Sequence, residues 1–170
     1  MTARIMKSAA GAGLLLAVVC AMGAAPARAA EQHNAGFDKL KTLVGEWDAK
    51  TSEGATVKVT YKLMSAGTAL METIGANDMA TLYHPDGDAV MLTHYCEANN
   101  QPRMRASRLS ADGSTLDFKF VDVTNEAYSS AGIMKNVRIT FQDADHFVQE
   151  WTYHKDGKET PEKFTYSRRK

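Results

Sequence analysis

The chain has 170 residues with 20 basic and 20 acidic side chains, so its formal net charge is zero. This balance gives no electrostatic attraction to the phosphates of nucleic acid or to an anionic membrane surface, and we expect neither as a partner. The length suits one domain that buries its own apolar core.

The first 29 residues have the pattern of a cleavable signal peptide. Arg4 and Lys7 supply a positive start, an apolar run covers residues 9–23, and Ala27 and Ala29 place small residues before the cleavage site. The run is too short and too rich in Ala and Gly to span a membrane. We predict cleavage after Ala29, no stable membrane insertion, and a periplasmic or secreted protein; an uncleaved anchor is the alternative.

Residues 30–170 then form the predicted single domain. They carry 17 basic side chains (20 minus Arg4, Lys7 and Arg28) against 20 acidic ones, a net charge of −3. Cys96 is the one cysteine left after residue 29, so no internal disulfide forms and the apolar core has to stabilise the fold by itself.

A short helix is predicted before a long series of strands. Asn34 suits its N-cap, Phe37, Leu40 and Val44 have helical spacing, and Gly45 ends it. After Gly45 the helical period disappears, and segments rich in β-branched and aromatic residues alternate with turn residues. We expect strands at 46–51, 55–64, 68–74, 78–84, 89–96, 103–109, 115–123, 136–142, 147–154 and 163–168.

The turns between these segments are short, and three of them contain Asp-Gly, at 86–87, 112–113 and 156–157. Short links make successive strands antiparallel neighbours. About ten such strands have too many edges for an open sheet, so we predict an all-β fold, a closed antiparallel up-and-down barrel. Its interior has room for one small ligand. The longer connection at 124–135 is either a lid or an ordinary crossover loop, and we favour the loop.

Gly45-x-Trp47, at the start of the first strand after a short helix, resembles the signature of the calycin superfamily: lipocalins, fatty-acid-binding proteins and nitrobindin-like barrels. In that superfamily a basic residue near the end of the last strand lies over the indole, a position that Arg168 or Arg169 matches. Residues 83–108 are also similar to secreted bacterial proteins of lipocalin-like fold whose function is not established. The resemblance implies a barrel that holds a small ligand.

The inward-facing residues depend on the register of two hairpins. Three-residue loops would place His84 opposite Asp88 and Leu82 opposite Val90, and in the second hairpin Met104 opposite Phe120. Two-residue loops would turn Met91, Thr93, Tyr95 and Arg105 inward instead. Taking both alternatives, the candidate cavity lining is Leu92, His94, Cys96, Met104, Arg105, Phe118, Phe120, Phe141 and Trp151.

His94 and Cys96 are two apart on one predicted strand and therefore share a face. With Met104 they would form a soft metal site suited to copper(I). The same pair could also act as a base and a thiol nucleophile. Core packing or ligand contact is the interpretation we favour, because buried His and Cys usually have such roles.

No catalytic or phosphate-binding motif occurs in the sequence. The resemblance to nitrobindin-like barrels keeps haem, held by His146 or His154, as a minor alternative; no cofactor is favoured. The function that we predict is non-catalytic binding of a small, mostly apolar molecule, with His94 or Arg105 supplying polar contacts. The alternatives are an enzyme or soft-metal protein using His94 and Cys96, and a packed interaction module without a cavity.

Overall fold

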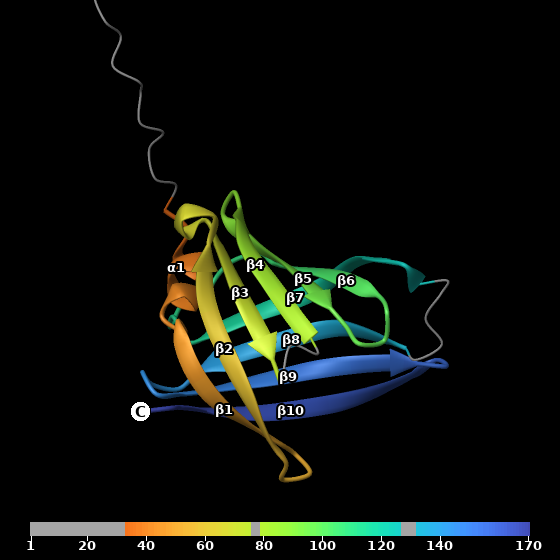
Figure 1. The fold of residues 1–170 in the computed structure, drawn as a ribbon. Helices are drawn as coiled ribbons and strands as arrows, with labels where there is room; N and C mark the ends of the chain where they lie inside the picture. Colours follow the sequence, from red (N-terminus) through yellow and green to blue (C-terminus); the bar gives the residue numbers. More distant parts are fainter. Residues whose placement is uncertain (1–32, 76–78, 127–131) are drawn as a thin grey trace, which may run out of the picture. The chain divides into compact units, whose positions relative to one another are not determined.

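A computed structural model describes residues 33–75, 79–126 and 132–170 of the chain. In these residues one short helix, α1 (Ala35–Lys41), precedes an antiparallel sheet that closes into a barrel (Figure 1). The predicted all-β barrel with a short leading helix is thus confirmed. No helix in this part of the chain is long and apolar enough to cross a membrane. The predicted signal peptide, and residues 127–131 of the predicted loop or lid, lie outside the described residues.

Each strand of the barrel pairs with the strand before it, and the last pairs with the first, which closes the sheet. The strands are β1 (Gly45–Thr51), β2 (Thr56–Met64), β3 (Ala69–Ile74), β4 (Met79–Asp86), β5 (Ala89–Tyr95), β6 (Gln101–Ala106), β7 (Thr115–Thr124), β8 (Ile133–Phe141), β9 (His146–Lys155) and β10 (Lys158–Arg168). A single 3₁₀ turn, η1 (Ser65–Gly67), joins β2 to β3.

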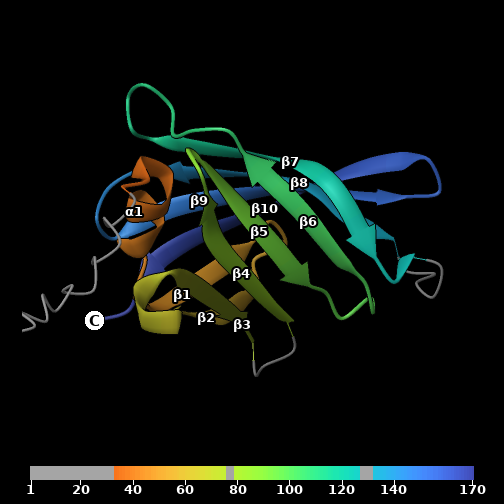
Figure 2. The same ribbon diagram turned by 90° about the horizontal axis from the view of Figure 1, so that it is seen from above.

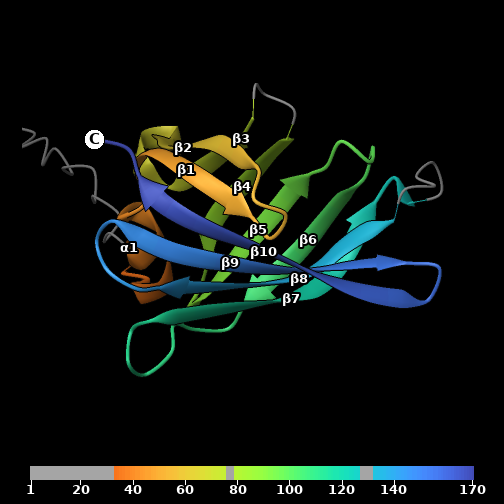
Figure 3. The same ribbon diagram turned by 90° about the horizontal axis from the view of Figure 1, so that it is seen from below.

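Strand β10 begins at Lys158, earlier than the predicted start at residue 163, and it contains Pro161. Proline fits there because residues 158–163 of β10 pair with β9 alone, so the missing N–H interrupts no second ladder. The β9–β10 hairpin therefore reaches past its neighbours, at the end of the barrel away from α1 (Figures 2 and 3).

Helix α1 covers the other end of the barrel. The Asn34 side chain accepts a hydrogen bond from the Phe37 N–H at 2.8 Å, as predicted for an N-cap, and donates to the carbonyl oxygens of Gly87 and Ala89 at 2.8 Å each. Phe37 and Leu40 are buried as predicted. The prediction for Val44 is wrong: the helix ends at Lys41, so Val44 is exposed and Leu43 is buried instead.

Trp47 lies beneath the helix and is 1% exposed. Its Nε1 donates to the Leu43 carbonyl at 2.7 Å, and its ring meets Phe147 edge to face. The Arg168 guanidinium lies 4.1 Å from the centre of the indole ring, the contact that the calycin resemblance implies. Arg169 instead pairs with Glu46 outside the barrel.

The register of the first hairpin differs from both predicted alternatives. Asp86 pairs with Ala89 around the two-residue loop Gly87–Asp88, and Gly87 has φ 59°, as the first position of a type II′ turn requires. The pairing is shifted by three positions from the predicted one. Because the shift is an odd number, the side chains of β4 that were expected to face inward face outward. Thr81 and Tyr83 therefore face the interior, where Leu82 was expected.

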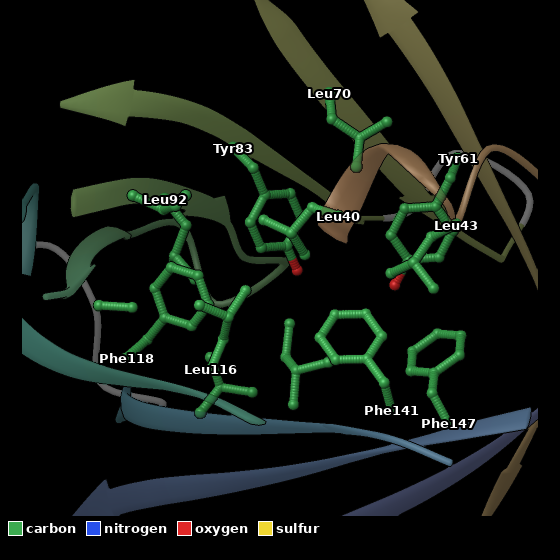
Figure 4. Close-up of a cluster of buried hydrophobic side chains, with 14 of the residues drawn as sticks. Leu40, Leu43, Tyr61, Leu70, Tyr83, Leu92, Leu116, Phe118, Phe141 and Phe147 are labelled. Atoms are coloured by element: carbon green, nitrogen blue, oxygen red, sulfur yellow. The ribbon is translucent and has the colours of Figure 1, made fainter. Parts of the chain in front are cut away.

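The second hairpin has the predicted register, since Met104 pairs with Phe120. On β5 the inward face is also the predicted one: Val90, Leu92 and His94 are buried. Figure 4 shows how densely the interior is filled near α1, where Leu40 and Leu43 lie close to Tyr83 and Tyr61. This packing confines any empty space to the other end of the barrel.

Candidate functional site

A cavity of about 800 Å³ lies at the end of the barrel away from α1. Its wall is formed mainly by strand ends that converge there and by the loop after β5. The described residues that line it are Ala49, Val57, Val59, Ile74, Gly75, Met79, His94, Cys96, Glu97, Ala98, Met134, Trp151, Tyr153, Glu162, Phe164 and Tyr166. Glu97 is exposed, so the cavity reaches the surface. Its size is within the range of small-molecule sites.

Most of the cavity wall is apolar or aromatic. Ile74, Met134 and Phe164 pack against the core on one side and remain only partly buried on the other. Trp151 is 4% exposed and contributes an aromatic face. Small-molecule sites commonly have walls of this kind, with a few polar groups among the apolar ones.

His94 is one of these polar groups. Its Nδ1 lies 2.9 Å from Thr81 Oγ1, and its ring lies beside Trp151, with centroids 5.1 Å apart. Nε2 is buried and has no hydrogen-bond partner among the described residues. Burial lowers the pKa of His94 from 6.5 to about 4, so the imidazole is neutral near pH 7 and offers an unused hydrogen-bond position in the wall.

Cys96 follows on the same side of the chain and is half-buried. Burial raises the pKa of its thiol above the usual value; the negative charges of Glu97 and Glu162 add to this, and a backbone hydrogen bond opposes it. A nucleophile or a soft-metal ligand needs the thiolate, which these surroundings disfavour.

A polar cluster lies deeper in the barrel, between the cavity and the packed end. Its centre is Glu72, which is fully buried. The Tyr61 and Tyr83 hydroxyls each donate to one Glu72 carboxylate oxygen at 2.7 Å. Figure 4 shows both tyrosine side chains directed into the interior from β2 and β4.

Gln149 connects this cluster to the cavity wall. Its Nε2 donates to Tyr61 and to Glu72, at 2.9 and 3.2 Å, and its Oε1 accepts from Trp151 Nε1 at 2.8 Å and from the Tyr166 hydroxyl at 3.1 Å. Trp151 and Tyr166 both line the cavity. The orientation of two aromatic wall residues is therefore fixed from behind by hydrogen bonds.

Burial raises the pKa of Glu72, while the hydrogen bonds donated to it, first by Tyr61 and Tyr83, oppose that shift. The pKa values of Tyr61, Tyr83 and Tyr166 are also raised, first by burial and then by the Glu72 charge. The tyrosines consequently stay protonated and act as donors. Their hydroxyl groups hold the Glu72 carboxylate in place by donated hydrogen bonds.

Of the candidate lining residues, the structure places His94, Cys96 and Trp151 together in the cavity wall. Leu92, Met104, Phe118 and Phe141 belong instead to the packed core, because the side chains under α1 fill that end. They do not line this cavity, and their predicted role in binding a ligand stays a prediction. The ligand-binding role of the three wall residues stays a prediction.

Two further candidates also lie away from the cavity. Arg105 is outside the barrel, where its Nε donates to Asp86 at 2.9 Å. Phe120 faces inward but is half-buried, and the Lys135 ammonium group lies 5.5 Å from its ring centre. Neither lines the cavity. Arg105 lies outside because the inward face of β6 is the one that carries Met104.

The proposed soft-metal set is not assembled. Met104 pairs with Leu92 on β5 instead of facing His94, so the predicted third ligand is wrong. Within the described residues no three His, Cys, Asp or Glu side chains are grouped to hold a metal ion.

His146 and His154, the two histidines considered as haem ligands, are not placed to bind haem in the cavity. His146 is exposed, with Nδ1 2.9 Å from Asp143, and His154 does not line the cavity.

Glu72 and its donors are not among the predicted site residues. The sequence of β3 contains a signal for Glu72. Alternate residues of a strand share one face, and on the face that carries Leu70 and Ile74 the carboxylate of Glu72 interrupts an otherwise apolar row. Glu162, which lines the cavity, was not predicted because the last strand was expected to start at residue 163, whereas β10 begins at Lys158.

No family model matches the chain, and no curated protein matches it. Among solved structures, the chain is similar to EF1p2_mFAP2b bound to DFHBI, with a TM-score of 0.38 and 14% identity, covering 78% of this chain and 98% of that chain. A likeness this distant carries no argument about function.

Proposed function

We propose that this protein binds a small, mostly apolar molecule in the barrel cavity and does not catalyse a reaction on it. The observation that carries the proposal is the cavity of about 800 Å³, lined mainly by apolar and aromatic side chains, at the end of the barrel away from the helix. The cavity also argues against a fully packed interaction module.

Two further parts of the proposal rest on the sequence and on one contact. The helix leading into Gly45-x-Trp47, together with Arg168 over the indole, supports membership of the calycin superfamily. The charged and apolar pattern of residues 1–29 supports export to the periplasm or the medium.

The enzyme and metal alternatives have weaker support. His94 and Cys96 do share the cavity wall, but burial disfavours the Cys96 thiolate that a nucleophile or a soft-metal ligand needs. The arrangement is that of a neutral hydrogen-bonding imidazole beside a small apolar thiol.

The direct test is titration with a neutral fluorescent probe, N-phenyl-1-naphthylamine. Val57 lines the cavity, and its neighbour Lys58 is exposed on the other face of β2. Val57→Trp should fill part of the cavity and weaken probe binding about tenfold or more, equivalent to about 1.4 kcal/mol. Lys58→Trp adds the same side chain outside and should leave binding unchanged. Equal binding by both variants would place the probe elsewhere and refute the proposal.

His94 and Cys96 separate binding from metal chemistry. His94→Phe should weaken ligands that carry a polar group by about 1–3 kcal/mol and leave apolar probes nearly unaffected. Cys96→Ala should change little. Stoichiometric copper or zinc in protein purified from its native compartment, lost in both variants, would support the metal alternative instead.

A further inference from the structure

The charged side chains in the described cavity wall are all acidic. Its described lining includes two carboxylates, Glu97 and Glu162, and no Lys or Arg. A site for fatty acids or other apolar anions needs a cation or several donors at the polar end of the ligand, and carboxylates would repel such a ligand. The negative charge of the wall therefore disfavours apolar anions as ligands.

Glu162 is the more significant of the two carboxylates. It lines the cavity from β10 and pairs across the sheet with Trp151, so the two side chains start from neighbouring positions on the same face of the sheet. It is half-buried, and no hydrogen bond or ion pair joins its side chain to another of the described residues. A half-buried carboxylate without a protein partner is available to a ligand.

A third carboxylate adds to the negative field. Glu53, in the loop between β1 and β2, lies near enough for its charge to raise the pKa of Glu162 further, after burial. Glu97 and Glu162 both act on the Cys96 thiol, so the fields of the two wall carboxylates overlap there. Aromatic side chains in the same wall, among them Trp151 and Tyr153, present faces that attract cations.

We propose that the natural ligand is an apolar cation: an amine or quaternary ammonium compound whose charged group lies between Glu162 and the Trp151 ring while its apolar body fills the cavity. This inference rests on the proposed binding function and names the class of ligand. A hydrogen-bond donor on the cation can also reach His94, which stands beside Trp151 in the same wall.

The test uses three competitors with the same decyl chain: decyltrimethylammonium, 1-decanol and decanoate. Each displaces N-phenyl-1-naphthylamine from the full barrel at low ionic strength, where charge effects are not screened. We expect the cation to bind about tenfold or more tightly than decanoate, with decanol between them.

Glu162→Gln should reduce the advantage of the cation over decanoate by about tenfold and leave decanol within about twofold of its original affinity. The matched control is Glu159→Gln, since Glu159 is an exposed carboxylate on the same strand outside the cavity wall. Its removal should not change the ratio. Unfolding midpoints of both variants show whether each still folds.

Two outcomes would overturn the inference. Decanoate binding as tightly as the cation, or an unchanged ratio in folded Glu162→Gln, would show that the wall carboxylate does not select the ligand, while decanol binding would still support the proposed function. Failure of all three competitors and of the neutral probe would refute both proposals.

Discussion

The two ends of this barrel are built in opposite ways. Under α1 the side chains fill the interior, Trp47 is enclosed by Phe147 and Arg168, and Asn34 binds the helix to the β4–β5 turn. At the other end Phe164 is only partly buried, and Glu162 and Nε2 of His94 lack partners among the described residues. A closed sheet can therefore be packed firmly at one end and still enclose space at the other. The remaining space can serve a ligand.

The sharpest test of this contrast compares one large aromatic residue from each end. Trp47→Ala should lower the free energy of unfolding by about 3–5 kcal/mol, as expected for a fully enclosed aromatic side chain. Phe164→Ala should cost about 1 kcal/mol, because part of that side chain already faces open space. Urea denaturation measures both. A loss near zero for Trp47→Ala would contradict the calycin assignment, and equal losses would remove the distinction between the ends.

The second prediction concerns the pH dependence of stability at the cavity end. The pKa of His94 is about 4 in the folded protein against about 6.5 when unfolded, because burial disfavours the charged imidazole. The unfolded chain therefore takes up a proton first as the pH falls. His94 contributes stability that is fully present above pH 6.5 and is lost as the pH falls to about 4, in total about 3 kcal/mol.

The measurement is the difference in unfolding free energy between the original protein and His94→Phe at several pH values. Other groups titrate in both proteins and cancel in this difference. As the pH falls from 6.5 to 4, the unfolding free energy of the original protein should decrease more than that of His94→Phe. A difference that stays constant over that window would mean that His94 is not buried as described.

The smallest expected effect lies at the turns. Gly87 and Gly113 have φ of 59° and 72°, and a Cβ at either position would meet no atom within 4 Å. Valine at either site should cost about 1 kcal/mol or more, purely because β-branched residues disfavour positive φ. Asp88→Val, in the same loop as Gly87 but without a positive φ, is the control and should cost less.

The barrel could be predicted from the sequence because its signals are local and repeated. Alternating apolar and polar residues indicate the strands, and Asp-Gly pairs indicate turns. Gly45-x-Trp47 indicates the packed end of the barrel, where Arg168 lies as the resemblance implies. The register of β4 could not be predicted, because Leu82 and Tyr83 are both apolar enough to face inward. The choice depends on a turn at Gly87–Asp88, whereas the predicted loop was 85–87 with 86–87 as its alternative.

The cavity was harder to predict than the fold. Alternation tells which side chains point inward, but not which inward positions are filled: Leu92 and His94 share a face, yet only His94 reaches the cavity. That difference comes from α1, which packs into one end. Tyr61 and Tyr83 come from the strands on either side of Glu72, and Tyr61 pairs with it directly, so part of this cluster follows from the order of the strands. Tyr166 comes from β10 and reaches Glu72 only in the closed barrel.

The pairing of β1 with β10 also governs when this protein can fold. Arg168 donates to the Thr42 carbonyl across a sequence separation of 126 residues, and the enclosure of Trp47 is incomplete until Arg168 is in place. During synthesis β1 emerges first and its partner last, so a partly made chain has open edges on both β1 and its most recent strand. Any cellular factor that acts on the unfolded chain therefore has the whole time of synthesis in which to bind it.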